Sequence, residues 1–418
     1  MRFLHAADLH IDSPLRGLDR YDGAPVDRLR SATRSALERL VDRALADAVD
    51  FVLLSGDIYD RDWQDFHTGL FFRAQMVRLD RGGIRVFLIQ GNHDAQGVIS
   101  KALVLPANVK VFSSRTPETE RLDDLGVAIH GRSFPDRAVI EDWVPSYPEP
   151  VPGYFNIGLL HTSLNGNPRH DTYAPTDKNT LIDKGYDYWA LGHIHAREVI
   201  CESPRIVFPG NLQGRHARET GPKGCEWVNV DGGRLTSEFI PLDVVRWHHV
   251  ELPLQGVDHL SAVGETFRRA LLPGCLEAAD RLHAVRVTLT GATPLFAVEA
   301  QHPGTLDAAL RAAAQDFGDM EIWIEQVRPH LANPIVRGEV SQREDAVGEL
   351  VRLVDAITED EQLLQDLGES ALAVLLRNLP TEISDDETLQ ITDLEALREL
   401  LRDAEATVLA RLVGAGDV

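Results

Sequence analysis

The sequence has little cysteine and comparatively few basic residues. Three cysteines stand among 418 residues, widely spaced and without a C-x-x-C pair, so neither a disulfide framework nor a thiolate zinc site is indicated. This pattern favours a reducing, cytoplasmic setting. The 42 lysine and arginine residues are outnumbered by 65 aspartate and glutamate residues, which gives a net charge of −23. The overall field therefore repels nucleic acids and anionic membranes, and any polyanion must be bound locally.

Long hydrophobic runs are missing as well. No apolar stretch approaches the roughly 18 residues that a membrane-spanning helix needs, so no membrane association is expected. The apolar residues 3–7 run directly into Asp8 and His10, so we expect no signal peptide and interpret Met1 as the start of a soluble domain. The length allows two or three domains at roughly 100 to 200 residues each.

The first part of the chain alternates short apolar runs with helical patterns. Strands are predicted for residues 3–7, 50–55 and 84–89, and helices for 26–48 and 66–79. Each predicted strand ends in a polar cluster. Because ligands of open α/β sheets lie beyond the carboxyl ends of the strands, we expect the functional residues there.

The pattern changes twice further along the chain. After about residue 105, short strands separated by proline and glycine predict a mixed or antiparallel sheet packed against the first. A smaller unit of strands and helices begins near Trp247. From Ile335 onward the pattern is helical, with 20 acidic and 7 basic residues, so this tail carries more than half of the net charge. Its apolar stripes either cover one another in a small bundle or leave one stripe for a partner.

Five polar clusters supply carboxylate, amide and imidazole groups after apolar runs. They are Asp8-x-His10, Gly56-Asp57, Gly91-Asn92-His93-Asp94, His161 and Gly192-His193-Ile194-His195. Each is a weak signal by itself. Gathered at one sheet edge, they suit two Mn²⁺, Fe²⁺ or Zn²⁺ ions rather than a soft-metal or all-oxygen calcium site. Two such ions, bridged by a shared carboxylate, clamp a phosphoryl group and lower the pKa of a water molecule.

The ordered set DxH, GD, GNHD, H and GHxH resembles the calcineurin-like metallophosphoesterase superfamily over roughly residues 1–241. More narrowly, residues 3–10, 56–60, 191–195 and 209–211 look like the SbcD-type DNA repair exonucleases. This resemblance implies an α/β (α+β) fold, with a four-layer sandwich of two mixed β-sheets flanked by helices. A small α/β cap domain and a helical C-terminal tail would follow.

The same resemblance implies three domains. Residues 1–245 would form the metallophosphoesterase (nuclease) domain, 246–334 a capping and DNA-binding domain, and 335–418 a helical region that binds an ATPase partner.

Individual roles follow from the resemblance, position by position. It implies that Asp57 bridges two metals, and that the full ligand set is Asp8, His10, Asp57 and His195 for one metal and Asp57, Asn92, His161 and His193 for the other. His93 would contact the scissile phosphate, and Asp94 would orient His93. The alternative for His93 is a structural group beside the metals. Asp60 stands where archaeal and eukaryotic relatives carry a second histidine, and no catalytic role is assigned to it.

Several polar residues carry less information. His5 is expected to be packed or to support the metal site. Seven cations either line a groove for a phosphate backbone or form a scattered solvated surface; they are Lys178, Lys184, Arg197, Arg205, Arg215, Arg218 and Lys223.

The implied function is a two-metal phosphodiesterase that cleaves DNA in repair. Mn²⁺ is the expected metal, with Fe or Zn as alternatives. The resemblance also implies that the C-terminal helices dock on an SMC-like coiled-coil ATPase, whose basic surface would supply the DNA affinity that this chain lacks. Two interpretations stay open for the helix predicted at residues 66–79: it forms a homodimer contact, or its apolar side chains are buried in the core. Two other functions stay open: a phosphodiesterase or phosphatase for small molecules or cyclic nucleotides, and a non-enzymatic assembly subunit.

Overall fold

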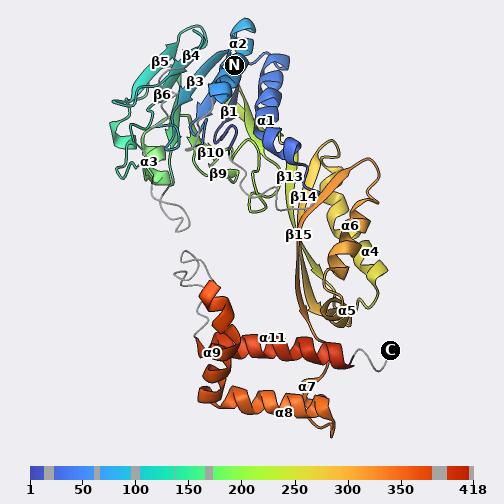
Figure 1. The fold of residues 1–418 in the computed structure, drawn as a ribbon. Helices are drawn as coiled ribbons and strands as arrows, with labels where there is room; N and C mark the ends of the chain where they lie inside the picture. Colours follow the sequence, from blue (N-terminus) through green and yellow to red (C-terminus); the bar gives the residue numbers. More distant parts are fainter. Residues whose placement is uncertain are drawn as a thin grey trace. The chain divides into compact units, whose positions relative to one another are not determined.

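The computed structural model divides the chain into two compact units, which are described separately here (Figure 1). The described residues are 1–13, 23–60, 66–95, 104–136, 138–164, 173–378 and 393–413. The first unit comprises Met1–His249, Ala278–Val285 and Asp319–Glu325, and the second comprises Val250–Glu277, Arg286–Gly318 and Gln326–Val418. The division into three domains at residues 245 and 334 stays a prediction.

One sheet of the first unit has the strand order β12-β11-β1-β2-β3-β4. The strands β1 to β4 are parallel, and β11 pairs antiparallel with β1 and with β12. Their bounds are β1 (Arg2–Ala6), β2 (Phe51–Ser55), β3 (Arg85–Ile89), β4 (Val109–Val111), β11 (Gly224–Asp231) and β12 (Arg234–Pro241).

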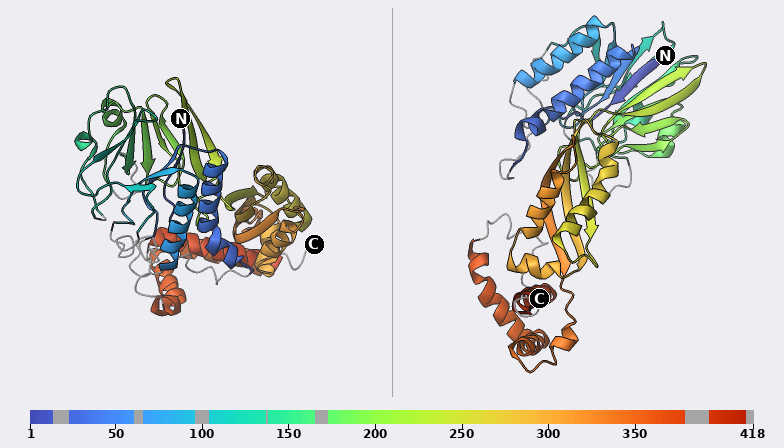
Figure 2. Two further views of the ribbon diagram at one scale, coloured as in Figure 1. Left: turned by 90° about the horizontal axis from the view of Figure 1, so that it is seen from above. Right: turned by 90° about the vertical axis from the view of Figure 1, so that its right-hand side faces the viewer.

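Two helices cover one face of this sheet, α1 (Val26–Ala46) and α2 (Phe66–Arg81) (Figures 1 and 2). Side chains alternate along β2, so that Val52 and Leu54 pack toward these helices while Phe51 and Leu53 pack on the other face. Because β2 is buried on both faces, its sequence is a nearly continuous apolar run and does not alternate with polar residues.

The second sheet packs against that other face, with the strand order β5-β6-β7-β8-β10-β9. The central strands are parallel and both outer strands are antiparallel. Their bounds are β5 (Glu118–Leu122), β6 (Val127–Gly131), β7 (Phe155–His161), β8 (Tyr188–Gly192), β9 (Glu198–Cys201) and β10 (Arg205–Phe208).

The outer face of the second sheet is covered by a third apolar cluster, to which the segments around η2 (Val144–Ser146) and α3 (Lys178–Asp183) contribute. Helices, sheet, sheet and this outer layer form the predicted four-layer sandwich of two mixed sheets.

The second unit contains α4 (Leu260–Leu276), α5 (Leu295–Gln301) and α6 (Thr305–Ala314). The buried face of α4 consists of residues at four-residue intervals, such as Val263, Phe267 and Leu271. A three-stranded sheet of order β13-β14-β15 contains residues assigned to each unit. Its strands are β13 (Val245–Pro253), β14 (Leu282–Ala292) and β15 (Glu321–Ala332).

The predicted helical tail is confirmed and lies in the second unit. Asp345 caps α8 by accepting hydrogen bonds from two backbone N–H groups of its first turn. The helices of the tail are α7 (Arg337–Val340), α8 (Ala346–Glu359), α9 (Glu361–Asn378) and α11 (Leu394–Val413). Among the described residues, no helix combines the length and apolar character needed to cross a bilayer.

Candidate metal centre

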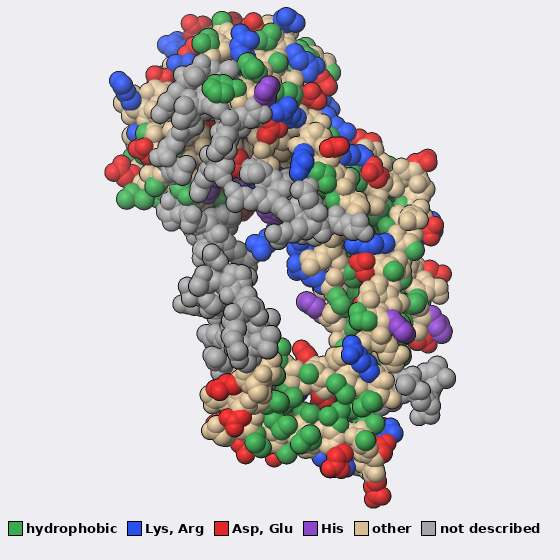
Figure 3. Space-filling view, viewed as in Figure 1, with side chains coloured by type: hydrophobic (Ala, Val, Ile, Leu, Met, Phe, Trp, Pro, Cys, Tyr) green, Lys and Arg blue, Asp and Glu red, His purple; other side chains and the backbone are tan. Residues whose placement is uncertain are grey.

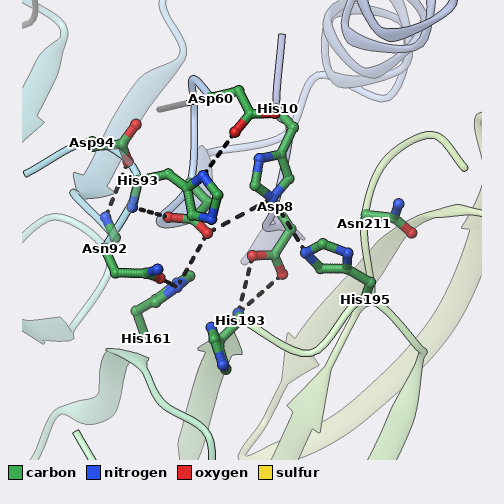
Figure 4. A network of polar contacts seen from close by, with 12 residues as sticks. Asp8, His10, Asp60, Asn92, His93, Asp94, His161, His193, His195 and Asn211 are labelled. Carbon is green, nitrogen blue, oxygen red and sulfur yellow. Dashed lines mark hydrogen bonds and ion pairs between the residues drawn. The ribbon is translucent and has the colours of Figure 1, made fainter. Parts of the chain in front are cut away.

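The predicted metal ligands lie where strands of both sheets end, and the fold brings them together (Figure 4). Two triplets of ligand atoms each fall within 4.8 Å, namely Asp8, His10 and His195, and Asp57, His161 and His193. Asp8 and His10 follow β1, Asp57 follows β2, His161 ends β7, and the two other histidines follow β8. Each triplet consists of three members of one predicted ligand set, and the ligand roles themselves stay predictions.

The backbone is strained where it delivers these side chains. Asp8, His10, Asp57 and His193 have positive φ angles of 52°, 41°, 52° and 101°. Non-glycine residues rarely adopt this region, which costs of order 1–3 kcal/mol each and persists where the surroundings enforce it. These backbone conformations direct the four side chains toward a common centre, whereas a continued strand would point successive side chains to opposite faces.

Glycines allow the close approach of these loops. A Cβ atom on Gly91 would collide with Oδ1 and the backbone nitrogen of Asp57. Gly56 has a φ of +95°, and a Cβ there would collide with Nδ1 of His161. The glycines of the GD and GNHD motifs therefore permit Asp57 and His161 to meet.

Asp57 lies between the two triplets. Its Oδ2 atom is 3.7 Å from Nε2 of His10 and 3.5 Å from Nε2 of His161. Its Oδ1 atom accepts a hydrogen bond from the backbone N–H of His93 at 3.0 Å. Burial opposes its charge, but His161 and the other histidines outweigh burial and hold the pKa of Asp57 well below its usual range. Asp57 therefore lies where the predicted bridging carboxylate is expected, and its bridging role stays a prediction.

The groups around Nε2 of His161 are acceptors, which favours a cation among them. The Nδ1–H group donates to the backbone carbonyl of Ser55 at 2.9 Å, so in the neutral ring Nε2 carries a lone pair. That nitrogen lies 3.0 Å from Oδ1 of Asn92 and faces Asp57. Burial lowers the pKa of this ring, but Asp57 outweighs it and raises the pKa of His161 to about 9. A proton or a metal ion must hold these acceptors together.

The second triplet has the same character. The Nε2 atoms of His10 and His195 face each other at 3.2 Å. His195 donates its Nδ1–H to Glu219 at 2.7 Å, which leaves its Nε2 lone pair directed at the centre. Within the described residues, Nδ1 of His10 is buried without a hydrogen-bond partner. The donor set of imidazoles, carboxylates and one amide thus fits two divalent cations.

The predicted role of Asp94 is wrong. Its carboxylate oxygens accept hydrogen bonds from the backbone N–H groups of Ile58, Tyr59 and Gly91. The imidazole of His93 instead donates from Nδ1 to Oδ1 of Asp60 at 2.8 Å. Neighbouring residues point in different directions on this turn, so Asp94 fastens two loops together while Asp60 contacts the His93 ring.

Sequence reasoning missed a group of residues beside His195. Glu219 is 7% exposed and accepts hydrogen bonds from His195, from Nδ2 of Asn211 and from the backbone N–H of Arg215. Asn211 belongs to a motif that the family resemblance had singled out, and this contact is its physical role. No periodicity or spacing marks Glu219 itself.

Four of the seven cations considered for a phosphate-binding groove or a solvated surface contact other groups of this chain. Arg197 and Arg205 pair with the buried Glu226, and Lys184 pairs with Glu149. Lys223 donates from Nζ to the backbone carbonyl of His195 at 2.7 Å. These four cations contact groups of this chain, and the two alternatives for the seven cations, a phosphate-binding groove and a solvated surface, stay predictions.

His5 is a packed residue, as expected. Its Nε2–H donates to the carbonyl of Leu191 at 3.1 Å, and its Nδ1 accepts from the hydroxyl of Tyr188 at 3.0 Å. Burial lowers the pKa of His5 to about 4, although Glu226 opposes this shift. The ring is therefore neutral and fully hydrogen-bonded.

Comparisons with known proteins indicate the family of the chain. Residues 1–197 match the family model for calcineurin-like phosphoesterases, and residues 247–332 match the middle domain of the metallophosphoesterase YhaO. An uncharacterized metallophosphoesterase of Bacillus subtilis, YhaO, is 35% identical over 339 residues, which are 78% of this chain and 81% of that protein.

Two more distant proteins are also similar. The DNA double-strand break repair protein Mre11 of Methanopyrus kandleri is 25% identical over 280 residues, or 58% of this chain and 57% of that protein. A solved structure of a dimetal phosphatase from Danio rerio is 12% identical, with a TM-score of 0.36, over 58% of this chain and 96% of the other.

Proposed function

Because the chain belongs to the calcineurin-like metallophosphoesterases, we propose that it is a two-metal phosphodiesterase that cleaves DNA. The observation that carries the hydrolytic part is the convergence of both ligand triplets on Asp57, with His93 beside them. DNA as the substrate is supported by the similarity to Mre11, whose name describes a DNA double-strand break repair protein.

The chain's own residues divide the work. Asp8, His10, Asp57 and His195 would hold one metal, and Asp57, Asn92, His161 and His193 the other. When bound, two divalent ions supply Lewis acidity toward the phosphoryl oxygens; Mn²⁺ is proposed, with Fe or Zn as alternatives. His93 keeps its Nδ1–H on Asp60, which leaves Nε2 to contact the phosphate or to protonate the leaving oxygen.

The acidic composition restricts how DNA reaches this site. Of the net charge of −23, the tail from residue 335 accounts for −13, and several remaining carboxylates belong to the metal centre. Two divalent cations would offset part of that charge. DNA bound by this chain without assistance is therefore expected to be held weakly, and a partner that presents DNA would overcome the repulsion.

The tail is the proposed docking surface for that partner, an SMC-like coiled-coil ATPase. Apolar side chains gather on the visible face of the C-terminal helices (Figure 3). Leu363, Leu367, Leu400 and Leu412 are 49%, 37%, 49% and 51% exposed, and apolar side chains gathered on one exposed face favour an interaction surface. Leu363→Glu is expected to abolish binding of a co-expressed coiled-coil ATPase, while Glu369→Gln, a nearby exposed polar position, preserves binding.

The test of the activity compares three substrates on one preparation with Mn²⁺. They are linear duplex DNA, bis(4-nitrophenyl) phosphate and 4-nitrophenyl phosphate, with Asp57→Ala as the inactive control. Hydrolysis of DNA and of the diester is expected. Hydrolysis of the small esters with intact DNA would contradict the nuclease proposal and favour a small-molecule phosphoesterase. A fully metal-loaded protein that hydrolyses none of them would favour an assembly subunit.

A further inference from the structure

Arg215 lies between two carboxylates that each contact a functional histidine. Its Nη1 atom is 3.6 Å from Oδ2 of Asp60, and its Nη2 atom is 3.2 Å from Oε1 of Glu219. The side chains of Arg215, Asp60 and Glu219 are 14%, 18% and 7% exposed. A guanidinium is planar and presents its donors in a fixed fork, so it sets the separation and orientation of both carboxylates.

Glu219 has little freedom to rotate. Its Oε1 atom accepts from Nδ1 of His195 at 2.7 Å and from Arg215. Its Oε2 atom accepts from Asn211 at 2.9 Å and from the backbone N–H of Arg215 at 2.7 Å. Because a carboxylate only accepts, the 2.7 Å contact places the proton of His195 on Nδ1 and leaves Nε2 for the metal position; Nη2 of Arg215 also lies 3.3 Å from Nδ1.

Asp60 is fastened in the same way on the other side of Arg215. Its Oδ2 atom accepts from the hydroxyl of Ser13 at 2.6 Å and faces the guanidinium. Its Oδ1 atom accepts from Nδ1 of His93 at 2.8 Å. His93 therefore also carries its proton on Nδ1, and Nε2 is the ring nitrogen left for substrate.

We propose that Asp60, Arg215 and Glu219 form one positioning unit for the hydrolytic site. Glu219 sets the tautomer and direction of a metal ligand, Asp60 sets those of the histidine that contacts substrate, and Arg215 couples the two. Asp60 lies 155 positions before Arg215 in the sequence, and Glu219 follows Arg215 by four positions. This assignment rests on the proposed phosphodiesterase function, and its tests include readouts that do not depend on turnover.

The metal arm measures Mn²⁺ binding to the full chain by titration calorimetry. Glu219→Ala is expected to weaken one of the two sites by about 10- to 100-fold and to leave the other unchanged. Glu219→Gln keeps an oxygen acceptor for Nδ1 of His195 and restores most of the affinity. Glu198→Ala, an exposed carboxylate, is the control. Unchanged affinity in Glu219→Ala, or an equal loss in Glu219→Gln, overturns the role of Glu219.

The substrate arm uses bis(4-nitrophenyl) phosphate. Asp60→Ala is expected to keep both Mn²⁺ affinities and to lower kcat by about 10- to 100-fold, and Asp60→Asn recovers part of this loss. Arg215→Ala is expected to weaken one Mn²⁺ site and to lower kcat. Arg215→Lys keeps the charge but lacks the guanidinium fork, so it should recover the affinity and kcat only in part. A loss of metal affinity in Asp60→Ala, or an unchanged kcat, overturns the role of Asp60.

Histidine ¹⁵N NMR separates this inference from the proposed function, because it needs neither metal nor substrate. In the wild type, His93 and His195 are each expected to be protonated at Nδ1. Glu219→Ala should change the tautomer of His195 only, Asp60→Ala that of His93 only, and Arg215→Ala both. If the tautomers respond in this way while the wild type hydrolyses no phosphodiester, the positioning unit stands and the proposed function fails. Unchanged tautomers overturn the positioning unit even in an active nuclease.

Discussion

Asp57 and His161 approach to 3.5 Å, between Oδ2 and Nε2, although Asp57 follows β2 and His161 ends β7, which are strands of two different sheets. The proposed metal centre therefore lies where the two sheets meet, and neither sheet supplies all of its residues. Because Asp57 faces both triplets, its loss is expected to affect both proposed metal positions, unlike the loss of any other single proposed ligand.

The first prediction concerns this bridge. Asp57→Asn keeps the shape of the side chain but removes the charge that faces His10 and His161. We expect both metals to be lost on dialysis and turnover to fall by more than about 100-fold, the upper end for residues that merely support a ligand. Metal content by plasma mass spectrometry and hydrolysis of bis(4-nitrophenyl) phosphate measure this. Asp124→Asn, at a residue whose side chain is 64% exposed, serves as the control; a variant with one tightly bound metal would contradict the bridging role.

The second prediction separates binding from catalysis at His93. Its ring contacts Asp60 and lies at the edge of the His10 ring, and it belongs to neither predicted ligand set. His93→Ala is expected to retain both metals and to lose about 10²- to 10⁴-fold in kcat, the range for a proton-transferring side chain. Metal analysis and kinetics on the same sample measure the two effects. A metal-depleted variant would show that His93 supports the ligands instead.

The proximity of the proposed metal ligands could be predicted from sequence because strand ends and motif spacing carry the information locally. Each of Asp8, Asp57 and His161 directly follows or ends an apolar run, and parallel strands bring such ends to one edge. The outer strands β5 and β9 were not predicted, since their sequences Glu118–Leu122 and Glu198–Cys201 are largely polar or partly exposed.

The supporting contacts could not be predicted because they join loops that no local pattern relates. Glu219 meets His195 through a loop without periodicity, and Asp60 meets His93 across 33 positions. Sequence adjacency favoured Asp94 as the partner of His93, but the turn directs its carboxylate to the backbone of Ile58 and Tyr59. The orientation of one side chain on a turn is a tertiary property.

The third prediction tests the close approach of two loops. Gly91→Ala places a methyl group against Oδ1 of Asp57, so the carboxylate must move. We expect lower metal content and turnover reduced by about 10-fold or more, the scale for disturbing a group that orients a ligand. Gly338→Ala is a matched control, because a Cβ there meets nothing within 4 Å. Full metal content in Gly91→Ala would mean that the loop adapts without affecting Asp57.

The fourth prediction concerns the helical tail of the second unit. Arg337 in α7 donates from Nε and Nη2 to both carboxylate oxygens of Glu405 in α11, at 2.9 and 3.1 Å. The Glu405 side chain is only 3% exposed, so Arg337→Ala leaves a buried charge and should destabilise the tail by about 1–3 kcal/mol.

Hydrogen exchange of α11 measures this loss. Turnover on bis(4-nitrophenyl) phosphate should stay unchanged, because the metal centre belongs to the other unit. Arg311→Ala, which removes a half-exposed pair with Asp307 on one helix, should have a smaller effect. Faster exchange in the control than in Arg337→Ala would contradict the proposed importance of the Glu405 contact.

The last prediction is a pH dependence of stability from His5. The folded protein holds this ring neutral, with a pKa of about 4, whereas in the unfolded chain its pKa is about 6.5. Between these values the unfolded state binds more protons, so His5 makes stability rise with pH from about 4 to 6.5 and has no effect above. The full contribution is about 3 kcal/mol.

The physical reason is burial, because the fully buried ring has no access to water that would stabilise its charged form. Thermal unfolding of wild type and His5→Gln at several pH values isolates the effect, because all other groups titrate equally in both. The slope between pH 4 and 6.5 should be smaller in the variant. His259→Gln, at a residue whose side chain is 78% exposed, should reproduce the wild-type slope; parallel curves for wild type and His5→Gln would mean that His5 accepts its second proton without cost.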